Sequence, residues 1–351
     1  MSLKSLKMNF IILLAVLAMI AGVMAVPIQA TADDTLIMNI NREGTAGYAV
    51  GTTIAKTISK YSDLRISGIP YSSPVAGFRD AAAGKCAIPY GSGVDLWQAF
   101  NSQGPYAKTP LKNKIYQGFY YFDANLFWIT RADRDDIKSL ADIEGKKVFP
   151  GKMGSGISEG FKYMLKALDI KMGKNVQMGY MDAANALKSG LVDVVGVYLV
   201  ARAKAMPSWT QNIDTQVKIK IIEPNEAEVK KLSTELGKYG IGFEKLATPF
   251  KQNTGIKGKT TWMGVEWWGW HFGSDVKTED AYTYLKTLFS PQAQADFKKG
   301  HKFFKGITNP KFAREMQIKG IGAVQGVPVH PGIAKYLKEI KLWQPEWKVG
   351  K

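Results

Sequence analysis

Residues 146–169 read KKVFPGKMGSGISEGFKYMLKALD and predict a strand, a glycine-rich loop and a helix in direct succession. The strand covers Lys147 to Phe149, and the loop covers Pro150 to Gly156. In the helix, apolar residues recur at steps of three and four and form one face. These residues are Ile157, Phe161, Met164, Leu165 and Leu168. The unit predicts part of a parallel α/β sheet, and the rest of the chain is interpreted around it.

The start of this helix is a predicted binding site for an anion. Ser155 suits the N-cap position, and Glu159 places negative charge in the first turn, where the helix dipole favours it. Backbone N–H groups of the first turn have no partner within the helix and point into the loop. Because glycines keep side chains away, a carboxylate or phosphate fits there. Two alternatives stay open, namely glycines that only make a tight turn and a catalytic or nucleotide-binding loop.

Known glycine motifs do not match this loop. The spacing G-x-x-x-x-G is present, but Ile157 stands where a P-loop needs lysine. The later glycines follow G-x-G-x-x-x-G instead of the dinucleotide pattern G-x-G-x-x-G. Residues 156–160 read G-x-S-x-G, yet Ser158 falls inside the helix and not on the sharp turn that a nucleophile elbow requires. The pattern therefore predicts neither a nucleotide site nor a serine hydrolase.

The N-terminus is typical of a secretory signal peptide. Lys4 and Lys7 precede an apolar run at residues 10–26, and Ala-Thr-Ala at residues 30–32 offers a cleavage site. An uncleaved membrane anchor is the alternative. We expect an exported product that begins near Asp33. With 351 residues the chain is long enough for two lobes.

Cysteine and histidine usage indicates no metal site. Cys86 is the only cysteine, so an intrachain disulfide is impossible, and its apolar neighbours indicate a small buried residue rather than a nucleophile. His271, His301 and His330 are scattered without the spacing of a zinc site. We predict no metal, no cofactor and no catalytic residue.

The chain is strongly basic. Its net charge is +17, or +15 without Lys4 and Lys7. The lysines are spread along the chain, which is typical of a solvated basic surface and gives only weak support to an anionic ligand. We predict no nucleic-acid partner. A basic protein that binds nucleic acid or an anionic polymer is the alternative, and it predicts steep salt dependence.

Strands alternate with helices along the chain. Predicted strands at residues 36–39, 64–69 and 87–89 are each followed by a loop rich in Gly, Ser or Tyr and then a helix. Such alternation predicts an α/β protein with a parallel sheet, whose ligands bind at the carboxyl ends of the strands. Two longer strands, at residues 114–130 and 260–272, are expected to cross between two lobes.

A tryptophan-rich stretch lies in the second long strand. It contains Trp262, Trp267, Trp268 and Trp270 around Glu266. Aromatic packing behind a hinge is the leading interpretation, and direct contact with a ligand is the alternative. Glu266 needs a cationic or donor partner among these indoles. That partner is expected to be a lysine or an amine on the ligand.

Three passages resemble the TAXI family of solute receptors, which serve TRAP-type secondary transporters. They are REGTAGYAVGTTIA at residues 42–55, IKSLADIEGKKVFPGKMGSGISEGFKYML at 137–165 and VPVHPGIAKYLKEIKLW at 327–343. Two loops depart from the family pattern. Gly47 stands where a second tyrosine is usual, and residues 71–77 read YSSPVAG without the usual glycine-serine pair and asparagine. The ligand is therefore expected to differ from the family's commonest one.

The resemblance implies a fold and a function. The fold would be α/β, a two-lobed periplasmic-binding-protein fold of type II with two parallel-rich sheets joined by hinge strands. Lobe 1 would comprise residues 33–123 and 266–351, and lobe 2 residues 124–265. The protein would be a periplasmic receptor for a small carboxylate resembling glutamate or 2-oxoglutarate, or for an aromatic or other organic acid. It would deliver this anionic solute to an integral-membrane TRAP permease.

The resemblance also implies a binding site between the lobes. Backbone N–H groups at Gly154, Ser155 and Gly156 would hold the carboxylate from lobe 2. The other expected ligand-binding residues are Thr45, Gly47, Tyr48, Ser72, Ser73, Tyr90, Ser92, Tyr198 and Glu266. A receptor of an ATP-driven importer for another ligand class is one alternative. An enzyme on the same fold is another, although the sequence does not align a nucleophile, a base and an orienting residue.

Overall fold

The computed structural model describes residues 35–43, 45–300 and 304–351. The predicted signal peptide lies outside these residues. From Leu36 onward the described chain forms one compact unit. Within the described ranges, no helix has the length and apolar character needed to cross a membrane.

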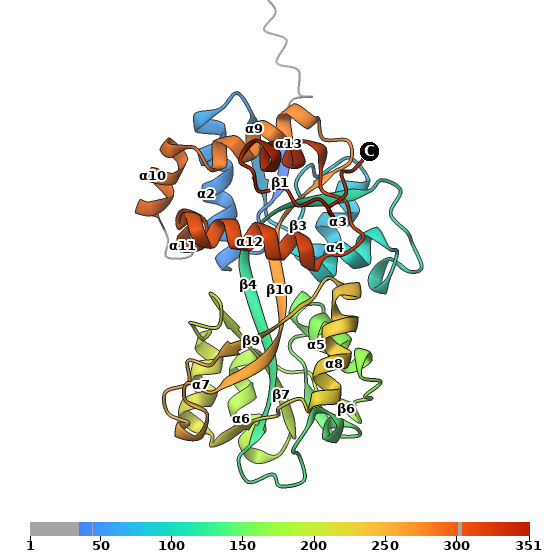
Figure 1. Ribbon diagram of the computed structural model, residues 1–351, viewed down its shortest axis with the longest axis vertical. Helices are drawn as coiled ribbons and strands as arrows, with labels where there is room; N and C mark the ends of the chain where they lie inside the picture. The colour runs from blue at the N-terminus through green and yellow to red at the C-terminus, as the bar shows by residue number, and fades with distance from the viewer. Residues whose placement is uncertain (1–34, 44, 301–303) are drawn as a thin grey trace, which may run out of the picture. The chain divides into compact units, whose positions relative to one another are not determined.

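Two long strands run through this unit and connect its two lobes (Figure 1). They are β4 (Ile115–Arg131) and β10 (Thr260–Gly273), which pair antiparallel along most of their length. Each begins and ends within one residue of its predicted bounds. The predicted α/β fold with two lobes joined by hinge strands is confirmed.

The predicted lobe boundaries stay a prediction. Their positions are consistent with each other, because Ala124 on β4 lies opposite Glu266 on β10. Both boundaries therefore fall at one level of the strand pair, where the chain passes from one lobe to the other (Figure 1).

The strands form one mixed eight-stranded sheet and a separate two-stranded sheet. The larger sheet has the order β3-β10-β4-β7-β5-β6, with β8 on β4 and β9 on β10. Its pairs are antiparallel except β5 with β6 and β5 with β7. Two parallel-rich sheets were expected; the long pairing of β4 with β10 instead joins the strands of both lobes. The remaining bounds are β1 (Thr35–Asn39), β2 (Arg65–Ile69), β3 (Tyr90–Ser92), β5 (Lys147–Phe149), β6 (Lys174–Asn175), β7 (Val194–Val200), β8 (Ile219–Ile221) and β9 (Gly242–Ala247).

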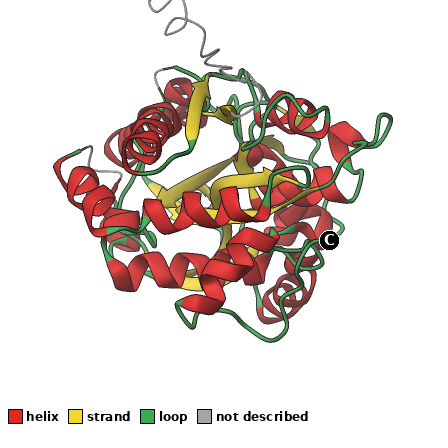
Figure 2. Cartoon of the chain, turned by 90° about the horizontal axis from the view of Figure 1, so that it is seen from above, coloured by secondary structure: helices red, strands yellow, loops and turns green. Residues whose placement is uncertain are grey.

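Helices surround the strands, as the view from above shows (Figure 2). Lobe 1 carries α2 (Ala46–Tyr61), α3 (Pro74–Ala82), α4 (Gly93–Phe100), α9 (Thr278–Leu288), α10 (Pro291–Lys299), α11 (Lys305–Thr308), α12 (Pro310–Ala323) and α13 (Pro331–Glu339). Lobe 2 carries α5 (Gly156–Ala167), α6 (Ala183–Ser189), α7 (Ser208–Gln216) and α8 (Glu226–Glu235). Four α-helices, α3, α10, α12 and α13, have proline in the first turn, where its missing N–H costs nothing.

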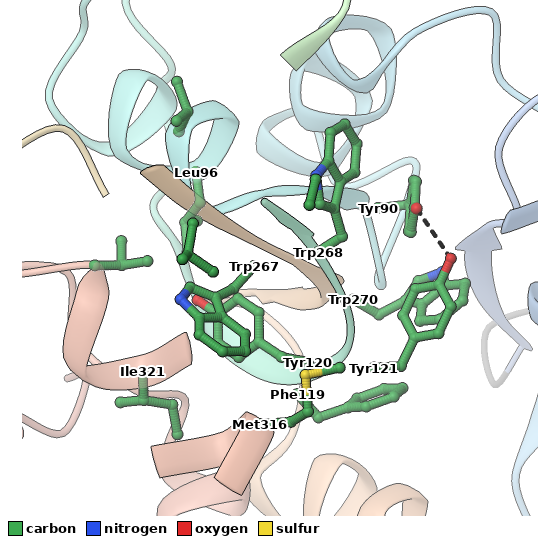
Figure 3. Packing of buried hydrophobic residues seen from close by; sticks show 14 of the residues in the cluster. Tyr90, Leu96, Phe119, Tyr120, Tyr121, Trp267, Trp268, Trp270, Met316 and Ile321 are labelled. Carbon is green, nitrogen blue, oxygen red and sulfur yellow. Dashed lines mark hydrogen bonds between the residues drawn. The ribbon is translucent and has the colours of Figure 1, made fainter. Parts of the chain in front are cut away.

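Aromatic side chains fill the core where β10 meets β4 (Figure 3). Trp267 and Trp270 are buried, and the Trp270 Nε1–H donates to the backbone oxygen of Asn39 (2.7 Å). Phe119 on β4 stacks on Trp270, with ring centroids 5.6 Å apart. These contacts support the interpretation of the tryptophan-rich stretch as packing. Cys86 is buried as a free thiol, as predicted.

Candidate functional site

The loop between β5 and α5 is organised by Ser155. Its backbone is extended, and its Oγ accepts the N–H of Ser158 (3.2 Å), so the predicted N-cap is confirmed. The same hydroxyl donates to the backbone oxygen of Lys152 (2.7 Å). The loop therefore uses its own serine to hold its shape. Gly154 is exposed and has a left-handed backbone, with φ of 75°, which favours glycine.

Groups from both lobes act on the hydroxyl oxygen of Tyr180. This residue begins η4 (Tyr180–Asp182) in lobe 2, and a Cβ on Gly151 would lie 3.2 Å from its oxygen. Burial raises the pKa of Tyr180, while the Ser155 hydroxyl and the Lys152 backbone N–H oppose that shift. The Arg42 guanidinium from lobe 1 also lowers this pKa. Burial outweighs these groups, and Glu266 adds to the rise of the pKa, so the Tyr180 hydroxyl stays neutral.

The sequence did not indicate Arg42 and Tyr180 as site residues. Arg42 opens the first predicted ligand loop, and its charge at that place was the available signal. Tyr180 follows β6, a strand of two residues. Such a short strand leaves no alternating pattern, so the loop after it was not recognised as the end of a strand.

Ser92 and Asp95 form a buried capping box at the start of α4. The Ser92 N–H and Oγ–H donate to Asp95 Oδ2 (2.8 and 2.9 Å), and the Asp95 N–H donates to Ser92 Oγ (3.2 Å). A Cβ on Gly156 would lie 2.9 Å from both Ser92 Oγ and Asp95 Oδ2. The start of α5 in lobe 2 thus packs against the start of α4 in lobe 1. Burial raises the pKa of Asp95 to about 6, although its bonds from Ser92 oppose the shift.

Glu266 lies beneath α5 and has no exposed surface. Neither carboxyl oxygen has a hydrogen-bond partner among the described residues, and Trp268 Nε1 and Ser158 Oγ are also buried without partners. Burial raises the pKa of Glu266 well above its ordinary value, and the nearby Asp95 raises it further. Of the two partners expected from the sequence, no lysine of the described residues pairs with Glu266.

Tyr90 belongs to an aromatic group in lobe 1. Its hydroxyl lies 3.1 Å from that of Tyr121 (Figure 3), and its ring lies 5.0 Å from the Trp270 ring between centroids. A Cβ on Gly47 would lie 3.3 Å from Tyr90 Cζ, so the start of α2 reaches the same place. Burial raises the pKa of Tyr90, and Tyr198 of lobe 2 contributes to the shift. The structure therefore brings the predicted residues Gly47 and Tyr90 together.

Lobe 2 presents a matching aromatic group. The Tyr198 ring lies 6.3 Å from Tyr180 and 5.7 Å from Trp209, and Tyr180 lies 4.8 Å from Trp209, all between centroids. These rings pack on one another against the hydrophobic core of lobe 2.

Two other predicted hydroxyl residues, Thr45 and Ser73, cap helices. Thr45 Oγ1 accepts the Tyr48 N–H (3.2 Å) at the start of α2 and donates to the Arg42 oxygen (2.6 Å). Ser73 Oγ accepts an amide N–H at the start of α3, and Ser72 is exposed. The contacts of the described chain do not join Ser72 or Ser73 to the α5 loop. Both stay predictions as ligand contacts.

No metal centre is formed by the described residues. They contain no group of three or more His, Cys, Asp or Glu side chains placed to hold an ion. Burial lowers the pKa of His271 to about 3 and that of His330 to about 4, so both rings are neutral at pH 7. His301 lies outside the described residues.

The family profile of the NMT1-like family matches residues 42–340, and the chain belongs to this family. No curated protein matches the sequence.

Solved structures similar to this chain include three periplasmic or transport proteins. A putative periplasmic sulfonate-binding protein, SsuA, from Methylobacillus flagellatus is 15% identical, with a TM-score of 0.46 over 90% of this chain and 98% of that one. The periplasmic aliphatic sulphonate binding protein SsuA from Escherichia coli is 13% identical, with a TM-score of 0.38 over 87% and 83%. A putative L-cystine ABC transporter from Listeria monocytogenes is 15% identical, with a TM-score of 0.38 over 83% and 97%.

Proposed function

We propose that the protein is an exported solute-binding receptor that closes its lobes around a small anionic organic solute and performs no chemistry. The observation that carries the proposal is the position of the Ser155 loop, because the start of α5 in lobe 2 packs against the Ser92–Asp95 box of lobe 1. The positive charge of Arg42 acts on the neighbouring Tyr180 from lobe 1. An anion at this place would contact both lobes. The predicted signal peptide at residues 1–32 supports export.

Closure follows from contacts that exist in only one state. A ligand that touches both lobes stabilises the closed form alone. Shifting the balance from 1:99 to 99:1 requires about 5.5 kcal/mol of preference for the closed form. Hydrogen bonds to a charged group contribute roughly 1.5–3 kcal/mol each, so a few of them suffice.

The solute we favour is a carboxylate with an apolar or aromatic part. Its carboxylate would take the place near Tyr180, held by Arg42 and by the amides of the α5 loop. Its apolar part would contact aromatic rings of lobe 1 and lobe 2. These rings include Tyr90, Tyr198 and Trp209. Glutamate and 2-oxoglutarate, which lack such a part, are the alternatives.

The transporter served by the receptor is the second part of the proposal. The three passages that resemble the TAXI family support a TRAP permease. The similar structures from Methylobacillus flagellatus and Listeria monocytogenes are described as parts of ABC transporters, which favours the ATP-driven importer. At TM-scores below 0.5 these likenesses do not decide between the two. Uptake of the solute, measured with and without ATP in vesicles that carry the permease encoded by a neighbouring gene, would decide between the two transporter types.

A thermal-shift screen of the mature chain tests the function. The compounds are amino acids, 2-oxo acids and aromatic acids. A ligand at 100 times its dissociation constant raises the free energy of unfolding by about 2.7 kcal/mol. A screen without any stabilising acid contradicts the proposal, and turnover of a bound acid would favour the enzyme alternative.

The variant Arg42→Gln tests the assigned cation. We expect its dissociation constant for the acid to rise about 10- to 100-fold, because a charge-assisted hydrogen bond is lost. The matched control is Arg65→Gln, which changes an exposed arginine on β2. Calorimetric titration of both variants measures the difference. Equal affinities for the two variants would remove Arg42 from the site.

A further inference from the structure

We propose that closure of the lobes is coupled to protonation of Glu266, whose carboxyl group is sealed where α5 of lobe 2 rests on β10. The proposal concerns the regulation of the closing movement and rests on the proposed receptor function for its biological meaning. The coupling itself is a property of the chain without ligand and can be measured without one.

The packing around Glu266 fits a neutral carboxyl group. A Cβ on Gly160 would overlap Glu266 Oε1, so the helix backbone lies directly on the carboxyl group. Both oxygens are buried and have no hydrogen-bond partner among the described residues. An ionised carboxylate in such a place has neither a formed hydrogen bond nor an ion pair to replace its hydration. The closed packing is therefore compatible with the acid and costly for the carboxylate.

The charged groups around Glu266 do not compensate an ionised form. On α4 the nearest is Asp95, and on α5 it is Glu159, which pairs with Lys162 (2.7 Å). On η4 the titratable group is Tyr180, whose pKa is raised by the charge of Glu266. On β4 the contact is the apolar Leu126. The neighbouring N–H groups of Trp268 and Gly160 lower the pKa of Glu266, but burial dominates and raises it.

Helix α5, which covers Glu266 through Gly160, packs against lobe 1 at its first turn. A Cβ on Gly156 would lie 2.9 Å from Asp95 Oδ2 on α4 and 3.0 Å from the ring of Trp268, which lies on β10 opposite Ser92 of β3. When the lobes separate, α4 leaves the start of α5 and water reaches the carboxyl group. Glu266 then returns toward its ordinary pKa of 4.5.

The direction in which pH shifts the closed-to-open ratio follows from the pKa of Glu266 in the closed and in the open state. Below the ordinary pKa both states are protonated and pH has no effect. Above it the open state loses its proton while the closed state keeps it, so the closed-to-open ratio falls about tenfold per pH unit. The fall ends when pH reaches the raised pKa of the closed state. Acid conditions therefore favour capture, and rising pH favours release.

A distance measurement across the lobes tests the coupling. Spin labels are placed at Lys56→Cys on α2 and Asn185→Cys on α6, both exposed, in a Cys86→Ala background of the mature chain. The fraction of closed molecules is measured without ligand from pH 4 to 9. We expect it to fall with pH in the labelled chain that retains Glu266.

Two variants and a control complete the test. Glu266→Gln and Glu266→Met both remove the titration, and the second also removes polar atoms in case the amide disturbs the fold. We expect both to stay closed across the pH range. The control Asp135→Asn changes an exposed carboxylate and should keep the response. A flat response of the parent chain, or a full response in either Glu266 variant, overturns the proposal.

The outcome is separable from that of the proposed function, because the assay contains no solute. A pH response that depends on Glu266, together with a screen that finds no acid, refutes the ligand class and leaves the coupling. Binding of an acid with pH-independent closure refutes the coupling alone.

Discussion

Ser155 shows how one side chain serves both local structure and the candidate site. Its position before an apolar helix predicted an N-cap, and its Oγ accepts the Ser158 N–H as expected. Its hydroxyl group donates to the backbone oxygen of Lys152 within the loop. The placement of Tyr180 beside it depends on a segment that follows about 25 residues later in the chain. A residue pattern predicts the cap, whereas the neighbour across the loop comes from packing.

We expect Ser155→Ala to lose both stability and ligand affinity. Loss of the cap costs about 0.5–2 kcal/mol, and loss of the hydroxyl bond to Lys152 loosens the loop whose amides are proposed to hold the anion. The matched control is Ser290→Ala, because Ser290 caps α10 through the Ala293 N–H (3.3 Å) away from the lobe boundary. Denaturant unfolding and calorimetric titration separate the two effects. The site assignment fails if Ser155→Ala binds the acid as tightly as Ser290→Ala does.

Helix α5 approaches its neighbours closely because of two glycines on one face. Gly156 and Gly160 are four residues apart, so they project the same way. The first faces the Ser92–Asp95 box and the second faces Glu266. The sequence placed these glycines in an anion loop and in an incomplete nucleophile pattern. In the structure they also let the helix lie against lobe 1 and β10.

We expect Gly160→Ala to lower the free energy of unfolding by about 1–3 kcal/mol. The added methyl group would overlap Glu266 Oε1 and lie 2.8 Å from Leu126 Cδ1, and both side chains are buried. The matched control is Gly322→Ala in α12, where no heavy atom lies within 4 Å of the new Cβ. That control should gain roughly 0.5–1 kcal/mol from helix propensity. Equal unfolding midpoints for the two variants would contradict the close packing of α5.

At the scale of the whole molecule, an ion-pair network joins the lobes beside the crossing strands. In lobe 2, Arg202 pairs with Glu244, and it also pairs with Glu315 on α12 of lobe 1 (3.5 Å). Lys319 on α12 pairs with Glu244 (2.7 Å) and with Glu315 (3.2 Å).

The turn that carries Arg202 is strained. Residues 201–203 have φ of 56°, 58° and 60°, a left-handed conformation that costs L-residues about 1–2 kcal/mol each. Two buried side chains of β4 hold it. Asp123 accepts the Arg202 N–H (2.9 Å), and Asn125 accepts the Ala203 N–H (2.6 Å). The strain is thus balanced by contacts with a hinge strand.

We expect Lys319→Ala to reduce the closed fraction by a small factor. The pairs it removes are about one-third exposed, so solvent limits each to roughly 0.2–1 kcal/mol. The remaining response to salt should also weaken, because charges across the lobes are screened over about 10 Å at 0.1 M. The control Lys335→Ala breaks an exposed pair with Glu279 inside lobe 1. The spin-label distance is the measurement, and an equal closed fraction in both variants would contradict the bridging role.

Local patterns alone determined most elements of this protein. The alternation and length of β4 and β10, the three- and four-residue spacing in α5 and the prolines that begin α10 and α13 are contained in short stretches of sequence. These patterns arise from backbone geometry and from one neighbouring turn, so they need no partner elsewhere in the chain.

Only the tertiary structure decided the surroundings of the site. It buried Glu266 beneath α5 and placed Asp95 against Gly156. It also brought Tyr180 to the glycine loop before α5, where the charge of Arg42 acts on its hydroxyl group. Each of these depends on residues far apart in the sequence, and burial, not residue type, determines whether a carboxyl group is charged or neutral. The sequence by itself therefore determined the α/β class, the crossing strands and the capped start of α5. Packing between the lobes decided which polar groups meet there, because only packing removes them from water.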